Sequence, residues 1–204
     1  VAGAAVDSVA AVSAEAAAGP AAAVRRVAAV PRAAGEGDGT MTMRWLRHLF
    51  APSARRMFPE ANLGRIADAV AAGERRHRGE VVFVVESELP LAALLRGRQA
   101  RERAAEAFAR LRVWDTEANN GVLLYLLLAD HRIEIVADRG LRNVPAGEWA
   151  QICRRLEARI ARDGAATAVV DAVDAISDIL AREFPRAPGE ADVDELPNRP
   201  VLLG

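Results

Sequence analysis

The chain has 204 residues and a formal net charge of −1, which leaves room for one core of ordinary size with tails at its ends. A balanced charge of this kind gives no electrostatic basis for binding nucleic acid. All 27 basic residues are arginine. This indicates a GC-rich genome rather than a preference for phosphate, so the arginine content alone predicts no ligand.

The first forty residues differ in composition from the rest, since sixteen of them are alanine. Asp7 and Glu15 interrupt the stretch that comes nearest to the apolar core of a secretory signal. We therefore expect residues 1–40 to form a disordered, low-complexity leader, and the protein to be cytoplasmic.

Residues 41–57 form a basic amphipathic segment, in which the run from Arg44 to Phe50 combines arginines with Trp45 and leucines. Such a run can lie on an anionic membrane surface, which would place the protein peripherally at the inner membrane. It can also pack as a helix on the flank of the domain, and we favour this alternative. We expect His48, and His131 further along the chain, to be exposed.

The residues that follow predict alternating helices and strands. Apolar spacing predicts a helix from Leu63 to His77 that is closed by Gly79, and a buried strand over residues 81–85 follows it. Pro90 then opens a long helix, which we expect to break near Gly97.

The stretch after this helix is the most informative in the chain. Residues 122–128 are apolar without a break, which predicts a strand covered on both faces. A turn at residues 129–131 leads into 132–135, where polar and apolar residues alternate as in a half-exposed strand. Helices are then predicted at about 146–162 and 165–183, and Cys153, the single cysteine, is expected to pack in the core.

These elements, in the order α β α β β α α, predict an α/β domain over residues 58–185 with a small mixed sheet sandwiched by helices. The crossover makes the first two strands parallel, and the tight turn makes the third strand antiparallel to them. We expect an extended tail over residues 186–204, and favour a tail that packs back along the domain over one that serves as a recognition peptide.

The predicted strand directions gather polar residues at the two ends of the sheet. Glu86, Ser87, Glu88, Asp130 and His131 come together at one end, where the usual rule for open parallel sheets places ligands. We call the other end the Asp138 pole. It gathers His77, Glu80, Trp114, Asp115, Thr116, Glu117, Asn119, Asn120, Asp138 and Arg139.

The Asp138 pole contains residue types that bind hard cations. Asp115, Glu117 and Asp138 supply carboxylates around two asparagine amides, and such oxygen ligands suit Ca²⁺ or Mg²⁺. The competing interpretation is that Asp115 and Asn119 only satisfy the backbone of a turn. Arg139 is expected either to pair with Asp138 or to bind an anionic ligand.

The chain also resembles a known family. It is similar to the TPM domain, also called the TPM phosphatase domain, in the segment Asn120-Gly121-Val122-Leu123-Leu124. A turn and a strand that ends in Gly140-Leu141 follow this segment, as in the family. The resemblance covers residues 41–204, and we therefore take Met41 or Met43 as the true start. Its further motifs are Phe58-Pro59, Glu74 to Glu80, Trp114-Asp115-Thr116 and Asp194-Glu195-Leu196-Pro197.

The resemblance implies an α/β sandwich, with relatives that include acid phosphatases and proteins that bind calcium or magnesium, and it places the site at the Asp138 pole. It also implies a LemA-type membrane protein as an expected partner. Where relatives carry an aspartate-rich segment, this chain has Arg55-Arg56-Met57-Phe58-Pro59. In place of the family's Gly-Tyr-Gly-Leu-Glu, this chain has Asp138-Arg139-Gly140-Leu141-Arg142. The resemblance matches Glu148 to an acid that lies slightly later in the family, so Glu148 is a fourth expected metal ligand.

The expected function is therefore a TPM domain whose Asp138 pole binds a divalent cation, a phosphoester or an anionic group of a partner. One alternative is a weak metal-dependent acid phosphatase, in which Asp115, Glu117 and Asp138 hold the cation and Arg139 steadies the phosphoryl group. The other is a non-catalytic adaptor for a membrane protein. The expected binding residues are Glu80, Trp114, Thr116, Asn119, Asn120 and Arg139.

Overall fold

The computed structural model describes residues 25–29, 41–187, 189 and 195–203. Five strands form one mixed sheet in the order β1-β4-β3-β2-β5. The strands are β1 (Arg25–Ala29), β2 (Val81–Glu86), β3 (Val122–Leu127), β4 (Arg132–Ala137) and β5 (Val201–Leu203). The helices are α1 (Met41–Leu49), α2 (Ala54–Met57), α3 (Glu60–Glu74), α4 (Leu91–Leu95), α5 (Ala100–Arg110), α6 (Ala146–Asp163) and α7 (Ala165–Glu183), with a 3₁₀ turn, η2 (Arg139–Leu141).

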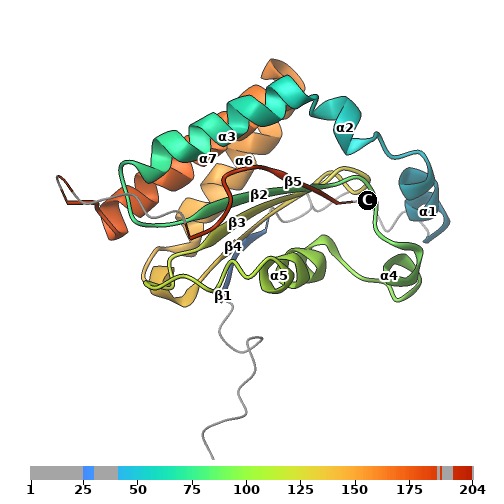
Figure 1. The fold of residues 1–204 in the computed structure, drawn as a ribbon. Helices are drawn as coiled ribbons and strands as arrows, with labels where there is room; N and C mark the ends of the chain where they lie inside the picture. Colours follow the sequence, from blue (N-terminus) through green and yellow to red (C-terminus); the bar gives the residue numbers. More distant parts are fainter. Residues whose placement is uncertain (1–24, 30–40, 188, 190–194, 204) are drawn as a thin grey trace, which may run out of the picture.

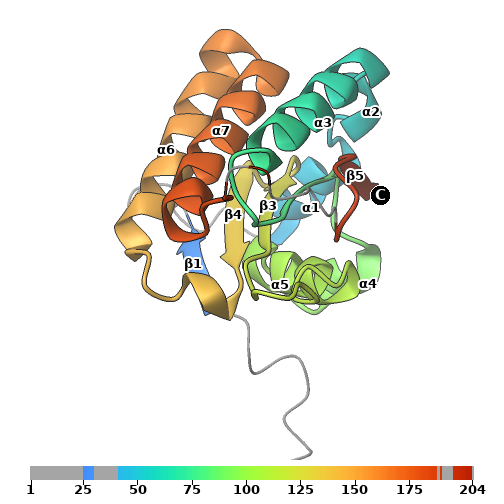
Figure 2. The same ribbon diagram turned by 60° about the vertical axis from the view of Figure 1, so that its left-hand side comes forward.

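Helices cover both faces of the sheet, so the domain has three layers. Figures 1 and 2 show α3, α6 and α7 on one face, and α4 and α5 on the other. The predicted α/β sandwich is therefore confirmed.

The predicted strand directions are also confirmed. β2 runs parallel to β3, with Phe83 opposite Leu124, and β4 runs antiparallel to β3, with Ile135 opposite the same leucine. Every residue of β2 and β3 is buried, as expected for strands covered on both faces.

Alternation along these strands divides the apolar side chains into two clusters. Leu124 and Ile135 point toward α3, α6 and α7, where they join Trp149. Leu123 points to the other face and packs with Phe108 of α5. Cys153 is buried in the first cluster, as predicted, and burial raises the pKa of its thiol to about 12.

The expected break in the long helix near Gly97 is also found. Gly97 has a φ of +65°, a left-handed conformation that favours glycine, and it lies between α4 and α5. The backbone N of Gln99 then donates to Glu102 Oε2 at 3.0 Å, which caps the first turn of α5.

The sheet is larger than predicted, because each sequence-terminal segment adds an edge strand. Arg25–Ala29 pair antiparallel with β4, so the expectation of a disordered leader over 1–40 is wrong for these five residues. The other residues of that segment lie outside the described part. Val201–Leu203 pair parallel with β2, which confirms that this part of the tail packs back on the domain.

Candidate functional site

The strand register places two acidic residues in one row at the Asp138 pole. Glu80 and Gly121 directly precede the paired Val81 and Val122, and Asp138 N donates to Gly121 O at 2.9 Å. Gly121 therefore lies between Glu80 and Asp138. Side chains two residues apart on a strand share a face, so both acids belong to the α5 face, like Val82 and Val136 beside them.

Asp138 is a buried acid of this pole. Only 1% of it is exposed. Its Oδ1 accepts a hydrogen bond from Arg139 N at 2.7 Å, which caps the 3₁₀ turn, whereas its Oδ2 is buried without a hydrogen-bond partner. Burial raises the pKa of this carboxyl, and the hydrogen bond from Arg139 N offsets part of the rise.

Gly121 leaves room for a backbone oxygen between the two acids. A Cβ atom added to Gly121 would overlap the carbonyl oxygen of Val113, so this oxygen lies directly above Gly121. The row thus combines the carboxylate of Asp138, the carboxylate of Glu80, which is also buried, and a backbone carbonyl. Oxygen atoms from three residues therefore lie in or directly above this row.

The loop that carries Val113 is held by contacts within the pole. Thr116 Oγ1 accepts from Asn120 N at 3.1 Å, and Asn119 has a φ of +54°, which asparagine adopts more readily than most residues. Asn119 Oδ1 accepts from Arg139 Nε at 2.7 Å. The structure therefore brings the predicted Asn119 and Arg139 into contact.

Two further predicted binding residues have structural partners. Asn120 is buried, and its Nδ2 donates to Arg78 O at 2.7 Å, while its Oδ1 is buried without a hydrogen-bond partner. The indole of Trp114 lies against Arg112, with 5.7 Å from the guanidinium carbon to the ring centroid. These contacts fix the ends of the loop.

The tail supplies a residue that sequence reasoning did not assign to this pole. Glu195 N donates to Glu80 Oε1 at 3.3 Å, and Glu195 Oε1 accepts from Glu117 N at 3.0 Å. Glu195 thus joins Glu80 to the loop. Its place in the family-like Asp194-Glu195-Leu196-Pro197 motif was the only signal for it in the sequence.

The remaining carboxylates predicted as metal ligands have other surroundings. Asp115 pairs with Arg112 at 2.6 Å, and Glu148 pairs with Arg182 of α7 at 3.0 Å. Glu117 is exposed. Within the described ranges, no three His, Cys, Asp or Glu side chains gather as a metal site. Asp138 carries a buried oxygen, Oδ2, that has no hydrogen-bond partner.

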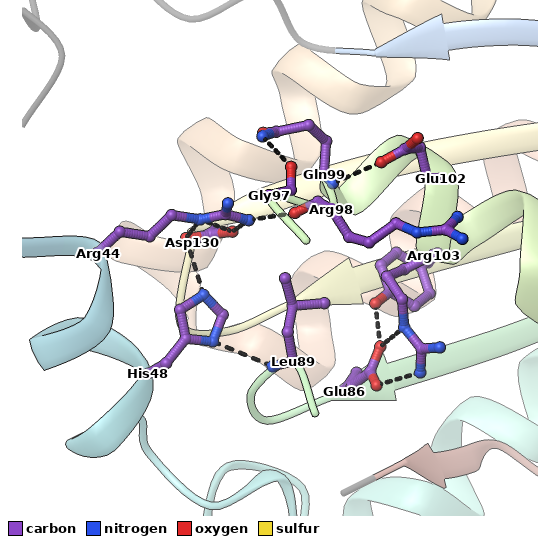
Figure 3. A network of polar contacts seen from close by, with 11 residues as sticks. Arg44, His48, Glu86, Leu89, Gly97, Arg98, Gln99, Glu102, Arg103 and Asp130 are labelled. Carbon is purple, nitrogen blue, oxygen red and sulfur yellow. Dashed lines mark hydrogen bonds and ion pairs between the residues drawn. The ribbon is translucent and has the colours of Figure 1, made fainter. Parts of the chain in front are cut away.

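The opposite pole holds a different set of polar contacts, shown in Figure 3. Arg44 Nη2 of α1 pairs with Asp130 Oδ2 at 2.9 Å, and His48 Nε2 lies 3.2 Å from Asp130 Oδ1. Leu89 N donates to His48 Nδ1 at 3.0 Å, so Nδ1 is an acceptor and Nε2 carries the proton toward Asp130. Burial opposes ionisation of Asp130, but Arg44 and His48 outweigh it and lower its pKa. We call these three side chains the Asp130 clamp.

The Asp130 clamp corrects one expectation and confirms another. His48 is buried, with 6% exposed, whereas we expected it at the surface. The clamp fastens α1 to the body of the domain, so the predicted packing of this segment on the domain flank is confirmed.

A second buried cluster lies under α5. Arg103 Nη2 pairs with Glu86 Oε1 at 2.5 Å, and the Tyr125 hydroxyl donates to Glu86 Oε2. Burial, with the adjacent Glu86, raises the pKa of Tyr125 well above its ordinary range, so the hydroxyl stays protonated. Glu86 and Tyr125 are both buried, and the cluster is a closed ion pair that joins the sheet to α5.

A polar groove of about 330 Å³ also lies at this pole, and His48, Ser53, Ser87 and Glu88 are among the residues that line it. Its residues do not form a nucleophile and base. Ser87 Oγ accepts from Ala54 N at 2.8 Å, and both nitrogens of His48 are engaged by Leu89 and Asp130.

The fold and the Asp138 pole define a three-layer α/β domain with an oxygen-rich site at one end of its sheet. A family model described as the TPM domain matches residues 54–179. The chain therefore belongs to the TPM domain family. A comparison with curated proteins gives no significant match.

One solved structure has a similar fold. The NMR structure of the BA42 protein from the psychrophilic bacterium Bizionia argentinensis superimposes with a TM-score of 0.63 at 23% sequence identity. The match covers 74% of this chain and 98% of BA42, so the common fold includes nearly the whole of that protein.

Proposed function

We propose that the Asp138 pole binds a divalent cation of the Ca²⁺ or Mg²⁺ type, and that the protein is a cation-binding domain rather than a phosphatase. The observation that carries this proposal is the buried Oδ2 of Asp138, which has no hydrogen-bond partner. A buried carboxylate oxygen in this state is costly unless a proton or a cation satisfies it.

The atoms beside Asp138 support a cation. Glu80 lies in the same row, and the Val113 carbonyl lies between the two acids above Gly121. Ca²⁺ and Mg²⁺ prefer oxygen ligands, and Ca²⁺ in particular accepts backbone carbonyls together with carboxylates.

Hydrolysis of a phosphoester finds less support in the same geometry. Arg139, which that alternative uses to steady a phosphoryl group, donates to Asn119. Asp115, which it uses to hold the metal, pairs with Arg112. A binding role uses the unsatisfied oxygen of Asp138 and leaves these pairs intact.

The substitution Asp138→Asn tests the proposal. Asparagine keeps an acceptor for Arg139 N but removes the buried charge, so the variant should fold and should lose cation binding. At a cation concentration about a hundredfold above Kd, the wild type should gain about 2.7 kcal/mol of unfolding free energy, a rise in Tm of several degrees. The Asn variant should gain none when both are melted in EDTA and in Ca²⁺ or Mg²⁺.

Asp115→Asn is the matched control, because it removes an exposed acid of the same pole that pairs with Arg112. It should leave the cation effect unchanged. An equal loss in both variants would show nonspecific charge attraction and contradict the proposal. Metal-dependent turnover of a phosphomonoester that disappears in Asp138→Asn would establish the phosphatase instead.

The pH dependence follows from the raised pKa of Asp138. Burial favours the protonated form of Asp138 in the folded state. This preference stabilises the folded protein below the unfolded-state pKa of the carboxyl, and the stabilisation is lost as the pH rises through the folded-state pKa. In EDTA, Asp138→Asn should therefore match the wild type at acid pH and exceed it at neutral pH. Cation affinity of the wild type should fall as the pH drops through the same range.

A further inference from the structure

The large apolar side chains that are exposed gather at one end of the molecule, far along the sheet from Asp138. In the described part of the chain, all of them belong to α1, to the residue after it, or to α4. They are Met43, Leu46, Leu49, Phe50, Leu91 and Leu95. Figure 1 shows α1 and α4 together at the right-hand end of the domain, and we call this face the α1–α4 surface.

α1 packs Trp45 against the core but leaves its other large apolar side chains, Met43, Leu46 and Leu49, exposed. Its polar residues Arg44 and His48, four positions apart, face the domain and bind Asp130. Leu49 and Phe50 are 75% and 76% exposed, whereas His48 is 6% exposed. A helix that only covered a core would bury its apolar stripe, so this stripe has another contact to make.

Apolar residues also line a groove between the two helices. The groove has a volume of about 650 Å³, and three of the exposed side chains, Leu46, Leu49 and Leu91, line it. The residues that line it are Trp45, Leu46, His48, Leu49, Glu88, Leu89, Pro90, Leu91 and Leu94.

The charge around this surface is mainly positive. The segments 41–59 and 89–101 contain seven arginines and no acidic residue, in a chain whose net charge is −1. Arg44 is neutralised by Asp130, whereas Arg47, Arg55, Arg56, Arg96 and Arg101 are exposed. Glu88 is the acid among the residues that line the groove. The surface is therefore apolar at its centre and cationic at its rim.

We propose that the α1–α4 surface docks the protein on an anionic phospholipid bilayer. The exposed leucines and Phe50 would enter the interfacial region, and the surrounding arginines would contact lipid phosphates. No helix in the described ranges is long and apolar enough to cross a bilayer. Side chains that project from two helices, with arginines around them, suit a planar anionic surface better than a narrow cleft.

The structure refines the sequence-based expectation of membrane contact through Arg44 to Phe50. Arg44 and His48 are excluded from the contact because they form the Asp130 clamp. α4, which is distant in sequence, contributes Leu91 and Leu95. The clamp holds α1 in the orientation that presents its apolar side outward.

Cosedimentation of the full chain with vesicles tests the proposal. Vesicles of phosphatidylcholine with phosphatidylglycerol are compared with phosphatidylcholine alone, in EDTA, so that cations bound at the Asp138 pole play no part. We expect binding to the anionic vesicles that weakens with added salt. The double substitution Leu49→Ser and Phe50→Ser should lower the partition coefficient at least about tenfold, and Arg47→Glu should lower it severalfold.

The matched control is Arg155→Glu, which makes the same charge change at an exposed arginine of α6, on the other side of the sheet. It should leave vesicle binding nearly unchanged. Equal binding to both kinds of vesicle, no binding at low salt, or equal effects of Arg47→Glu and Arg155→Glu would overturn the proposal. Self-association that disappears in the Leu49 and Phe50 double variant would assign the surface to a second copy of the chain instead.

Discussion

Replacing Gly121 by alanine should lower the free energy of unfolding by at least about 3 kcal/mol, one of the largest effects of a single substitution in this protein. A Cβ atom at this position would overlap the Val113 carbonyl, which belongs to backbone and cannot rotate away. Either the loop that begins at Val113 or the start of β3 must move. Urea unfolding followed by circular dichroism measures the loss.

Gly64→Ala is the matched control for this substitution. Gly64 is an exposed residue within α3, and a Cβ atom there would have no neighbour within 4 Å. Alanine should stabilise the helix by about 0.8–1.0 kcal/mol. If Gly121→Ala had a similarly favourable effect, the close approach of Val113 to the strand would not exist.

Replacing Arg103 by methionine should destabilise the protein by about 3–5 kcal/mol, because it leaves the carboxylate of Glu86 buried without its cation. Glu86 is 1% exposed, and its remaining partner in this cluster is the Tyr125 hydroxyl. A neutral hydroxyl cannot balance a buried charge. Thermal and urea unfolding at neutral pH measure the effect.

Arg101→Met provides the control on the same helix, since Arg101 is exposed, and it should change stability by less than about 0.5 kcal/mol. Adding Glu86→Gln to Arg103→Met should recover a large part of the loss, because it removes the unpaired charge. Additive losses in the double variant would mean that the two residues do not interact in solution.

The sequence predicted the parts of the fold that depend on long apolar patterns. The uninterrupted run of β3 and the periodic helices α6 and α7 were visible because burial on both faces or on one stripe leaves a strong signal. β1 and β5 were missed, since they are edge strands of five and three residues. Pairing with an existing edge stabilises them, and so short a segment carries no pattern of its own.

The candidate site was predicted less completely. The register of β3 and β4 brought Asn119 toward Arg139 and Gly121 toward Asp138, and both contacts depend on a hairpin that the sequence predicted well. The pairing of Asp115 with Arg112 depends on how a loop closes, and the arrival of Glu195 depends on how the tail folds back. Neither follows from local spacing.

The orientation of α1 in the α1–α4 surface could not be predicted from the sequence. A basic amphipathic run was recognised in residues 41–57, but a helical pattern does not say which side of the helix faces the domain. Asp130, which decides the orientation by binding Arg44 and His48, is more than eighty positions away along the chain. Only the tertiary structure shows that Met43, Leu46 and Leu49 of α1 are turned outward.

The most direct test of the proposed cation site is a titration of the full, isotope-labelled chain with Ca²⁺ and with Mg²⁺, followed by residue-resolved NMR. A site at the Asp138 pole predicts saturable shifts that centre on the amides of Gly121, Asp138 and Arg139. Those of Glu86 and Asp130 should remain unchanged, and Asp138→Asn should abolish the shifts. Shifts that centre on Glu86 and Asp130, or none at millimolar cation, would contradict the proposal.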